Sequence, residues 1–287
     1  MTIVNLGSIN IDHIYTMPHL VTPGETLAAT SFQSALGGKG ANQSIAIARA
    51  GGTVFHGGMI NRKDEAWLKP MMDAGVDVAM VAHGDLPTGH AIVAVDDTTG
   101  ENQIILSPSS NNAVPDHIGA WLLEKAGEGD WALAQNETNQ TSSFLKDAKA
   151  KGLSICYSAA PFVADITADL LPLVDLLIVN EGEYADLVSH LGRADLGINH
   201  LIVTKGSKGA TYYGDGEPFD CPAIKVEAID TTGAGDTYLG YVLAGLDGGM
   251  TMQDAMERAA VAAAIQVTRL GASEAIPTAD EVADASF

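Results

Sequence analysis

The sequence predicts an α/β fold in three layers, in which helices flank a mostly parallel sheet and a small β lid is added. Short apolar runs alternate with segments of helical periodicity over most of the chain, and this order is typical of repeated strand–helix–strand units. Two β-rich stretches interrupt the order, at 10–36 and 86–110. We expect parts of both to form the lid of a single domain that spans residues 1–287.

The first third of the chain predicts alternating elements and one hairpin. The apolar run TIVNLG predicts a buried strand, and GANQSIAIARAGG predicts a helix that ends at Gly51 and Gly52. TVFHGG predicts the next strand, and DEAWLKPMMDAG predicts a helix that Pro70 kinks. HAIVAVDDTTGENQIILS alternates on both sides of a turn rich in Asp, Thr and Gly, which predicts a hairpin.

The rest of the chain repeats the alternation and ends in helices. Strands are predicted at WALAQ, LSICYS, DLLIVN and HLIVTKG, and helices at TSSFLKDAKAKG and EGEYADLVSHLG. ATYYGDGEPFDCPAI predicts a hairpin that turns at GDGE, and VEAID predicts the end of a last strand. DTYLGYVLAGL and MTMQDAMERAAVAAAIQVTRLG predict the closing helices. This order favours a parallel sheet, because a helical crossover joins strands of the same direction.

Composition and charge exclude several kinds of partner. The chain has 36 acidic and 15 basic residues, and its formal net charge of −21 repels the phosphates of nucleic acids and anionic lipids. No apolar run approaches the roughly 18 residues of a membrane-spanning helix. Cys156 and Cys221 lack C-x-x-C spacing, and the N-terminus lacks the pattern of a signal peptide. We therefore expect a protein of the reducing cytoplasm, with small-molecule ligands and neither nucleic acid nor membrane as a partner.

The stretch DTTGAGD carries the most specific chemical signal. Gly233, Ala234 and Gly235 are small residues at the start of an apolar helix, where free backbone N–H groups bind anions. Asp236 adds a carboxylate, which suits a general base that takes the proton of a hydroxyl as it attacks phosphorus. The alternative is a plain turn in which Asp236 caps the helix. The stretch alone leaves both interpretations open.

Two other nucleotide-binding motifs are absent from the sequence. GGKGAN lacks the earlier glycine and the following Ser or Thr of a P-loop. No G-x-G-x-x-G follows the first predicted strand, which disfavours a dinucleotide-dependent enzyme.

Several segments, in order along the chain, resemble the ribokinase-like (PfkB) carbohydrate kinase family. GGKGANQSIAIARAGG at 37–52 is similar to the family's N-terminal signature, and DTTGAGDTYLG to its C-terminal signature. LGSINIDHI, VNEGEYADL and IVTKGSKGA are similar to further family segments. The resemblance implies an ATP-dependent kinase acting on the 5-hydroxyl of D-ribose, with another sugar, a sugar acid or a nucleoside as the alternative. A non-catalytic regulator on the same scaffold is disfavoured by the intact GAGD set.

The resemblance implies a role for each matched residue. Asp236 is expected to be the general base and a substrate contact, and the backbone amides of Gly233, Ala234, Gly235 and Asp236 are expected to form an anion hole. Planar amides and carboxylates suit sugar hydroxyls, and the expected sugar-binding residues are Asn10, Asp12, Gly38, Lys39, Asn42 and Glu137. The expected nucleotide-binding residues are Asn180, Thr204, Gly206, Ser207 and Gly209. Glu183 is expected to hold Mg²⁺ through water, and Asn180 with Glu183 also fits a capping box, a compatible role.

The resemblance also implies a monovalent cation, potassium, beside the anion hole, and a second copy of the chain as a partner. The cation ligands are expected on two segments, at Asp230 and Thr232 and at Gln266, Arg269, Gly271 and Ala275. A serine is common at the last of these positions in the family, so alanine weakens the site. Exposed edge strands of the lid favour a homodimer through the lids.

Three segments depart from the family pattern. Ser158 stands where an asparagine is usual, and Ser109 and Ser110 precede Asn111 where the family has Gly-Ala-Asn. MINRKDEAWLKPM lacks the usual G-x-D-x-x-G. Because the catalytic set is intact, these departures bear on the identity of the substrate more than on activity.

Overall fold

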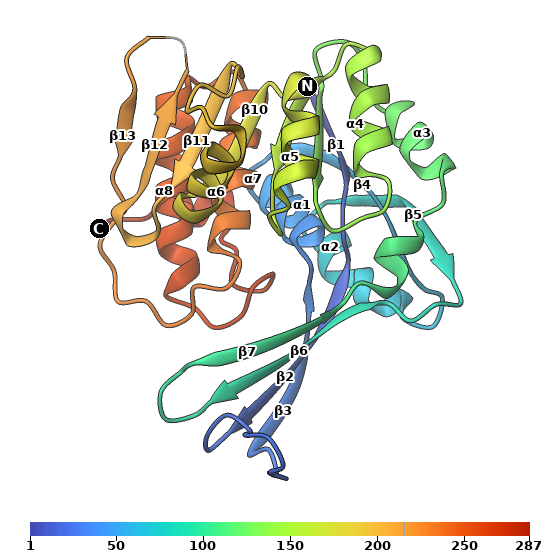
Figure 1. Ribbon diagram of the computed structural model, residues 1–287, viewed down its shortest axis with the longest axis vertical. Coiled ribbons are helices and arrows are strands. Elements are labelled where there is room, and N and C mark those ends of the chain that lie inside the picture. Colours follow the sequence, from blue (N-terminus) through green and yellow to red (C-terminus); the bar gives the residue numbers. More distant parts are fainter. Residues whose placement is uncertain (215) are drawn as a thin grey trace.

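Two sheets organise the chain in the computed structural model, which describes residues 1–214 and 216–287 (Figure 1). The larger sheet has nine strands and the smaller has four. Helices cover the larger sheet, and the smaller sheet projects away from it (Figure 1). The predicted α/β fold with a mostly parallel sheet is confirmed.

The large sheet has the strand order β13-β12-β11-β10-β9-β8-β1-β4-β5. Its strands are β1 (Thr2–Leu6), β4 (Thr53–Asn61), β5 (Asp77–Gly84), β8 (Trp131–Gln135), β9 (Ser154–Ser158), β10 (Leu176–Asn180), β11 (His200–Thr204), β12 (Ala210–Tyr213) and β13 (Phe219–Cys221). Pairing is parallel from β5 through to β11, and antiparallel at β11–β12 and β12–β13. The predicted turn of that last hairpin includes residue 215, which lies outside the described residues.

Each face of the large sheet has its own core. Ile3 and Val4 are adjacent in β1, both are fully buried, and they belong to different clusters because successive strand side chains point to opposite faces. One cluster includes α1 (Lys39–Arg49), α2 (Lys69–Asp73), α7 (Ala234–Asp247), α8 (Met252–Val267) and α9 (Ala279–Ala283). The other includes α3 (His117–Leu123), α4 (Thr141–Ala150), α5 (Ala164–Leu170) and α6 (Glu181–Leu191).

The small sheet is built from the two β-rich stretches that interrupt the alternation. Its strands are β2 (Asn10–Met17), β3 (Ser31–Gly37), β6 (Gly89–Asp96) and β7 (Asn102–Ser107), in the order β3-β2-β6-β7. Three residues separate the end of β1 from the start of β2, so the small sheet continues directly from β1, which lies between β8 and β4 inside the large sheet. This continuity places the first residues of β2 beside the start of α1.

Two predicted elements differ from the structure. DEAWLKPMMDAG forms a 3₁₀ turn, Glu65–Leu68, before α2, and Pro70 lies in the first turn of α2, where its missing N–H breaks no helical bond. VEAID forms no strand. Pro222 follows β13 and cannot donate to a ladder, and the N–H groups of Ile229 and Asp230 bond to the carbonyl of Val267 instead.

The two cysteines, Cys156 and Cys221, are free and buried. Within residues 1–214 and 216–287, none of the helices combines the length and the hydropathy that crossing a bilayer requires.

Candidate active site

Glycines in GGKG bring the start of α1 against the turn between β1 and β2. A Cβ at Gly40 would lie 2.4 Å from the Ser8 nitrogen, and one at Gly37 would lie 2.0 Å from an oxygen of Asp12. Gly38 precedes α1 with φ of 90°, a conformation that favours glycine. At Gly38 and Gly40, the glycines on either side of Lys39, the close neighbours of an added Cβ all belong to the chain itself, so these glycines allow tight packing of the backbone.

Asp236 lies in the first turn of α7 and faces α1. Its two carboxylate oxygens accept hydrogen bonds from Gln43 Nε2 at 2.8 Å and from Asn42 Nδ2 at 3.2 Å. The N-cap of α7 is Gly233, with φ of 76°, and the side chain of Asp236 does not cap the helix. The geometry therefore favours a carboxylate held for chemistry over the alternative of a capping residue.

Burial and nearby polar groups act in opposite directions on the Asp236 carboxyl. Burial raises its pKa, whereas Lys39 and the amides of Gln43 and Asn42 lower it, and the net direction is upward. Such a shift moves a carboxylate toward the range in which it accepts a proton more readily during catalysis.

Lys39 supplies a positive charge among four carboxyl groups. Burial disfavours its charged form, but Asp236, Glu137, Glu183 and Asp12 together raise the pKa of its ammonium group. Lys39 is therefore charged at neutral pH. These four carboxyl groups come from β2, from the β8–α4 connection, from α6 and from α7, so one ammonium group influences acidic side chains of four separate segments.

The expected sugar-binding residues gather at the start of β2. Asn10 Oδ1 accepts a hydrogen bond from Asn111 Nδ2 at 2.7 Å, and Asn111 Oδ1 accepts from the Ile9 N–H at 3.0 Å. Glu137 accepts from the Ser8 hydroxyl and, at 3.1 Å, from the Lys39 N–H. Asp12, two residues after Asn10, lies on the same face of β2.

Burial is the largest influence on the Asp12 carboxyl and raises its pKa to about 6. Glu137 and Glu274 contribute to this rise of the pKa, and Lys39 opposes it. Asn42 is buried, and its Oδ1 lacks a hydrogen-bond partner among the described residues. Oxygen acceptors from several elements therefore converge at this point.

A cavity of about 680 Å³ lies on the other side of Asp236 and opens beside the start of α7. It collects all five residues expected at the nucleotide, namely Asn180, Thr204, Gly206, Ser207 and Gly209. Ala234 and Gly235 of the expected anion hole also line it. Its remaining wall is largely apolar and includes Ile224, Val226, Ala260, Ala263, Ala264 and Val267.

Asn180 and Glu183 form the predicted capping box at the start of α6. Asn180 Oδ1 accepts from the Glu183 N–H at 2.9 Å, and Glu183 Oε2 accepts from the Asn180 N–H at 2.8 Å. Burial raises the pKa of Glu183, and the Asn180 N–H and Lys39 oppose that shift. The box fixes the Glu183 carboxylate at the end of β10, next to the cavity that Asn180 lines.

Comparison with known proteins identifies the family. The model of the pfkB family carbohydrate kinases matches residues 2–279. The chain belongs to the PfkB carbohydrate kinase family. It is accordingly an ATP-dependent sugar kinase, as predicted.

The kinase is similar to ribokinases from several organisms. It is 34% identical over 300 residues to the ribokinase of Haemophilus influenzae, which covers 98% of this chain and 96% of that one. The ribokinase of Cryptococcus neoformans var. grubii serotype A in complex with ADP matches with a TM-score of 0.85, 31% identity and 99% of both chains covered. The Arabidopsis thaliana ribokinase complexed with ribose and ATP matches with a TM-score of 0.87 and 27% identity, over 98% of this chain and 97% of that one.

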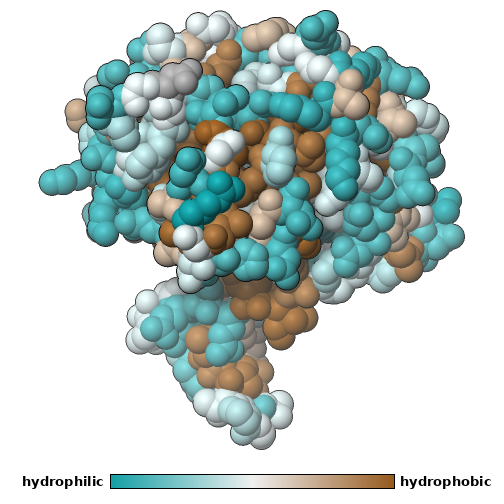
Figure 2. Space-filling view, turned by 45° about the horizontal axis from the view of Figure 1, so that its top comes forward, coloured by the Kyte–Doolittle hydropathy of each residue, from teal (hydrophilic) through white to brown (hydrophobic). Residues whose placement is uncertain are grey.

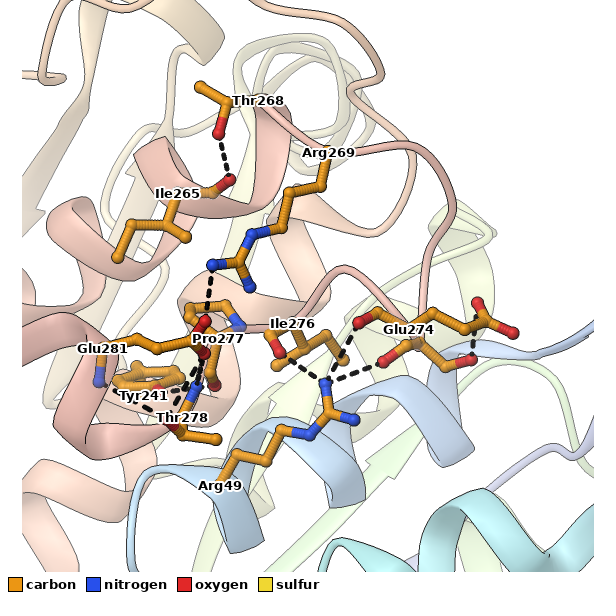
Figure 3. Close-up of polar contacts among 11 residues, drawn as sticks. Arg49, Tyr241, Ile265, Thr268, Arg269, Glu274, Ile276, Pro277, Thr278 and Glu281 are labelled. Carbon is orange, nitrogen blue, oxygen red and sulfur yellow. Dashed lines mark hydrogen bonds and ion pairs between the residues drawn. The ribbon is translucent and has the colours of Figure 1, made fainter.

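The segment after α8 in this kinase is anchored on two sides (Figure 3). Arg49 of α1 donates to the carbonyl oxygen of Ser273 at 3.0 Å and to that of Ile276. Arg269, expected at the cation, donates its guanidinium to Glu281 of α9 at 2.6 Å. Its side chain is therefore committed to a structural ion pair.

Asp230 joins that segment to the anion-hole loop of the kinase. Its two oxygens accept hydrogen bonds from the N–H groups of Thr232 at 2.9 Å and Gly271 at 3.0 Å. Three residues expected at the cation, Asp230, Thr232 and Gly271, are thus brought together. Gln266 is close as well, since its Nε2 lies 3.0 Å from the Thr232 oxygen.

The departure from the family pattern at Ser109 and Ser110 has a local structural role. Ser109, where the family has glycine, has φ of 43°. Ser110 donates to the carbonyl of Met59 at 2.7 Å and accepts from the Gly89 N–H at 3.2 Å. Asn111 donates to Asn10, so this segment supports a residue that is expected to bind the sugar.

Proposed function

We propose that the protein transfers the γ-phosphoryl group of ATP to the 5-hydroxyl of D-ribose. The observation that carries the proposal is the carboxylate of Asp236, which two side-chain amides hold between the oxygen-rich cluster at β2 and the cavity of about 680 Å³. The names of the similar ribokinases support ribose as the acceptor. Another sugar, a sugar acid or a nucleoside is the alternative within the same family.

Asp236 acts as the general base of this proposal. The sugar oxygen attacks the γ-phosphorus, its proton passes to Asp236, and the bond from phosphorus to the bridging oxygen breaks as ADP leaves. The first amides of a helix lack partners within the helix. The Ala234 N–H already donates to the Thr231 carbonyl at 3.3 Å, so the anion hole depends chiefly on the N–H groups of Gly233, Gly235 and Asp236.

The sugar is held by acceptors and one cation. Asn10, Asp12, Asn42 and Glu137 accept hydrogen bonds from hydroxyls, and Lys39 donates to the same ligand. Because the four carboxyl groups around Lys39 keep it charged, it also offsets negative charge near the moving phosphoryl group.

Mg²⁺ is the metal that the family implies, and the residues present fit it. In such sites Mg²⁺ uses one or two carboxylates together with phosphates and water. Glu183 offers one carboxylate beside the nucleotide cavity, already oriented by Asn180. When bound, the ion supplies neutralisation of the phosphate charge.

The small sheet acts as a lid over the sugar. It carries Asn10 and Asp12 on β2, so its movement brings these side chains onto the substrate. A closed lid excludes water, which limits hydrolysis of ATP.

A second copy of the chain covers the outer face of this lid. Figure 2 shows apolar surface on the projecting sheet. Phe32 and Ile105 are 57% and 67% exposed. Ile105 pairs with Ile92, Ile92 with His13, and His13 stacks on Phe32, so all four lie on one face.

Turnover against a panel of substrates tests the proposed activity. ADP release with Mg·ATP is measured for ribose, other pentoses, ketohexoses, sugar acids and nucleosides, with the Asp236→Asn variant as control. The expected result is turnover of ribose that the variant loses. If only another acceptor is turned over, that acceptor is the substrate, and the proposed mechanism still holds. ATP binding without any turnover favours the alternative of a non-catalytic regulator on the same scaffold.

A further inference from the structure

One side chain fills a cluster of backbone carbonyls beside the anion-hole loop. Gln266 lies near the end of α8 and is fully buried. Its Nε2 donates to the carbonyl oxygens of Thr232 at 3.0 Å and Ala272 at 3.0 Å, and it lies 3.4 Å from that of Gly271. Three carbonyls from two separate segments therefore point at one amide nitrogen.

The surrounding groups fix the orientation of the Gln266 amide. A carbonyl oxygen only accepts hydrogen bonds, so all three require the NH₂ group to face them. On the other side, the Thr237 hydroxyl donates to Gln266 Oε1 at 3.1 Å. The reversed amide would place an oxygen against three oxygens.

The residues present do not fit the monovalent cation that the family implies. Backbone carbonyls that converge on one point are how proteins hold potassium, and here that point is taken by the nitrogen of Gln266. Both oxygens of Asp230 already accept from N–H groups. Ala275 has no oxygen in its side chain.

We propose that the amide of Gln266 does the structural work of a monovalent cation, so that the kinase needs no potassium. Gln266 ties the loop on both sides of Asp236, through the Thr232 carbonyl before it and the Thr237 hydroxyl after it. A Cβ on Gly233 would lie 3.4 Å from the same nitrogen. The anion-hole loop is therefore held by a built-in donor whose presence does not depend on salt.

The first arm of the test uses the unaltered protein. Melting temperature and kcat/KM are measured in potassium, sodium, caesium or tetramethylammonium chloride at one ionic strength. We expect kcat/KM to agree within about twofold and Tm within about 1 °C. Activation by potassium of about tenfold or more, or a Tm that rises with potassium alone, overturns the proposal.

The second arm removes the donor. Gln266→Ala leaves the carbonyl oxygens without a donor, and Gln266→Glu places a carboxylate against them. In both variants a bound cation would be needed to balance these oxygens. In tetramethylammonium we expect a Tm lower by several degrees and kcat/KM lower by about tenfold, with recovery in potassium. Gln253→Ala, at an exposed position of the same helix, is the matched control and changes neither quantity.

The two arms separate this inference from the proposed activity on which its kinetic readout rests. If no acceptor is turned over, the cation response of Tm still tests the role of Gln266. Variants that keep full stability and activity in tetramethylammonium contradict that role. Variants that lose both and do not recover in potassium show that the site is not a cation site, and they also overturn the proposal.

Discussion

At the scale of single residues, the role of the Asp236 charge can be tested by a substitution that keeps the size of the side chain among its neighbouring amides. We expect Asp236→Asn to lower kcat by about 10²- to 10⁴-fold, the range of a general base. Because burial already raises the pKa of this carboxyl, a neutral side chain removes a buried charge and should not lower Tm. Nucleotide affinity should stay unchanged. Initial rates, nucleotide titration and melting curves check these three expectations.

Two outcomes contradict this role for Asp236. Near-normal turnover of the variant would remove it as the base. A loss of nucleotide affinity as large as the loss of turnover would assign the residue to binding. Asp147→Asn in α4, a helix that packs on the opposite face of the large sheet, is a matched control and should leave all three quantities unchanged.

The carboxyl of Asp12 predicts a pH dependence of sugar binding. Its pKa of about 6 means that the carboxylate, the form that accepts from hydroxyls, is lost as the pH falls through 6. We expect KM for the sugar to rise by about tenfold for each further pH unit, with little change in KM for ATP. A sugar KM that is flat between pH 5 and 7.5 would contradict it.

The same shift predicts the sign of a stability effect. The folded state binds this proton more tightly than the unfolded state, so ionisation of Asp12 destabilises the fold as the pH rises from about 4 to 6. Asp12→Asn should therefore raise the free energy of unfolding of the ligand-free protein at pH 7.5, by about 1–3 kcal/mol. Denaturant unfolding at pH 4 and 7.5 measures the difference.

The sequence allows a role to be proposed for residues that lie in a motif, but not for the residues that contact them in the fold. Asn10, Asp12 and Asp236 stood at the ends of predicted elements, where side chains of parallel units meet. Gln43 follows Asn42 in a helix, and nothing in the periodicity distinguishes a buried glutamine from a solvent-facing one. Glu274 had no local signal, because its influence on Asp12 comes only from the folding of a distant segment.

At the scale of elements, the contact between α1 and the β1–β2 turn depends on the absence of a side chain at Gly40. A Cβ there would lie 2.4 Å from the nitrogen of Ser8 and 2.5 Å from the Cα of Gly7, and both of these neighbours are backbone atoms. We expect Gly40→Ala to lower the free energy of unfolding by about 2–3 kcal/mol, as overpacking does. The shift also displaces Lys39, so kcat/KM falls.

A glycine in open surroundings provides the comparison for Gly40. Gly127 is exposed, and the nearest atom to its added Cβ is 3.9 Å away. Gly127→Ala should change the free energy of unfolding by no more than about 0.5 kcal/mol. Equal effects of the two substitutions in denaturant melts would show that the contact at Gly40 is not tight.

Helices and strands could be predicted from the sequence where a single local pattern specifies them. Apolar runs gave the buried strands, and caps gave the helix ends, as at the box of Asn180 and Glu183. VEAID has the composition of a strand, but its N–H groups bond to the end of α8, a tertiary partner that no local pattern reveals. Pro70 lies in a helical segment, as predicted, but it does not kink a longer helix. It lies in the first turn of α2, because that helix begins only at Lys69.

At the scale of the whole molecule, charge and apolar surface act in opposite directions. A net charge of −21 keeps copies of the chain apart. The outer face of the small sheet nevertheless exposes Phe32, Ile92 and Ile105 together, and a soluble chain rarely leaves such a patch uncovered. Salt screens the repulsion over distances of about 10 Å at 0.1 M, so association should strengthen as salt is added.

The proposed dimer is tested by mass. Light scattering should give about twice the chain mass of 29.8 kDa, and Ile105→Lys should return the mass to that of one chain because it buries a charge in the contact. Asp12 lies on the opposite face of β2 from its neighbour His13, so the substitution leaves the sugar-binding side chains in place. Trp121→Lys, at an exposed position of α3, is the control and should not change the mass. A monomeric parent protein at working concentration would leave the patch without a partner copy and contradict the proposal.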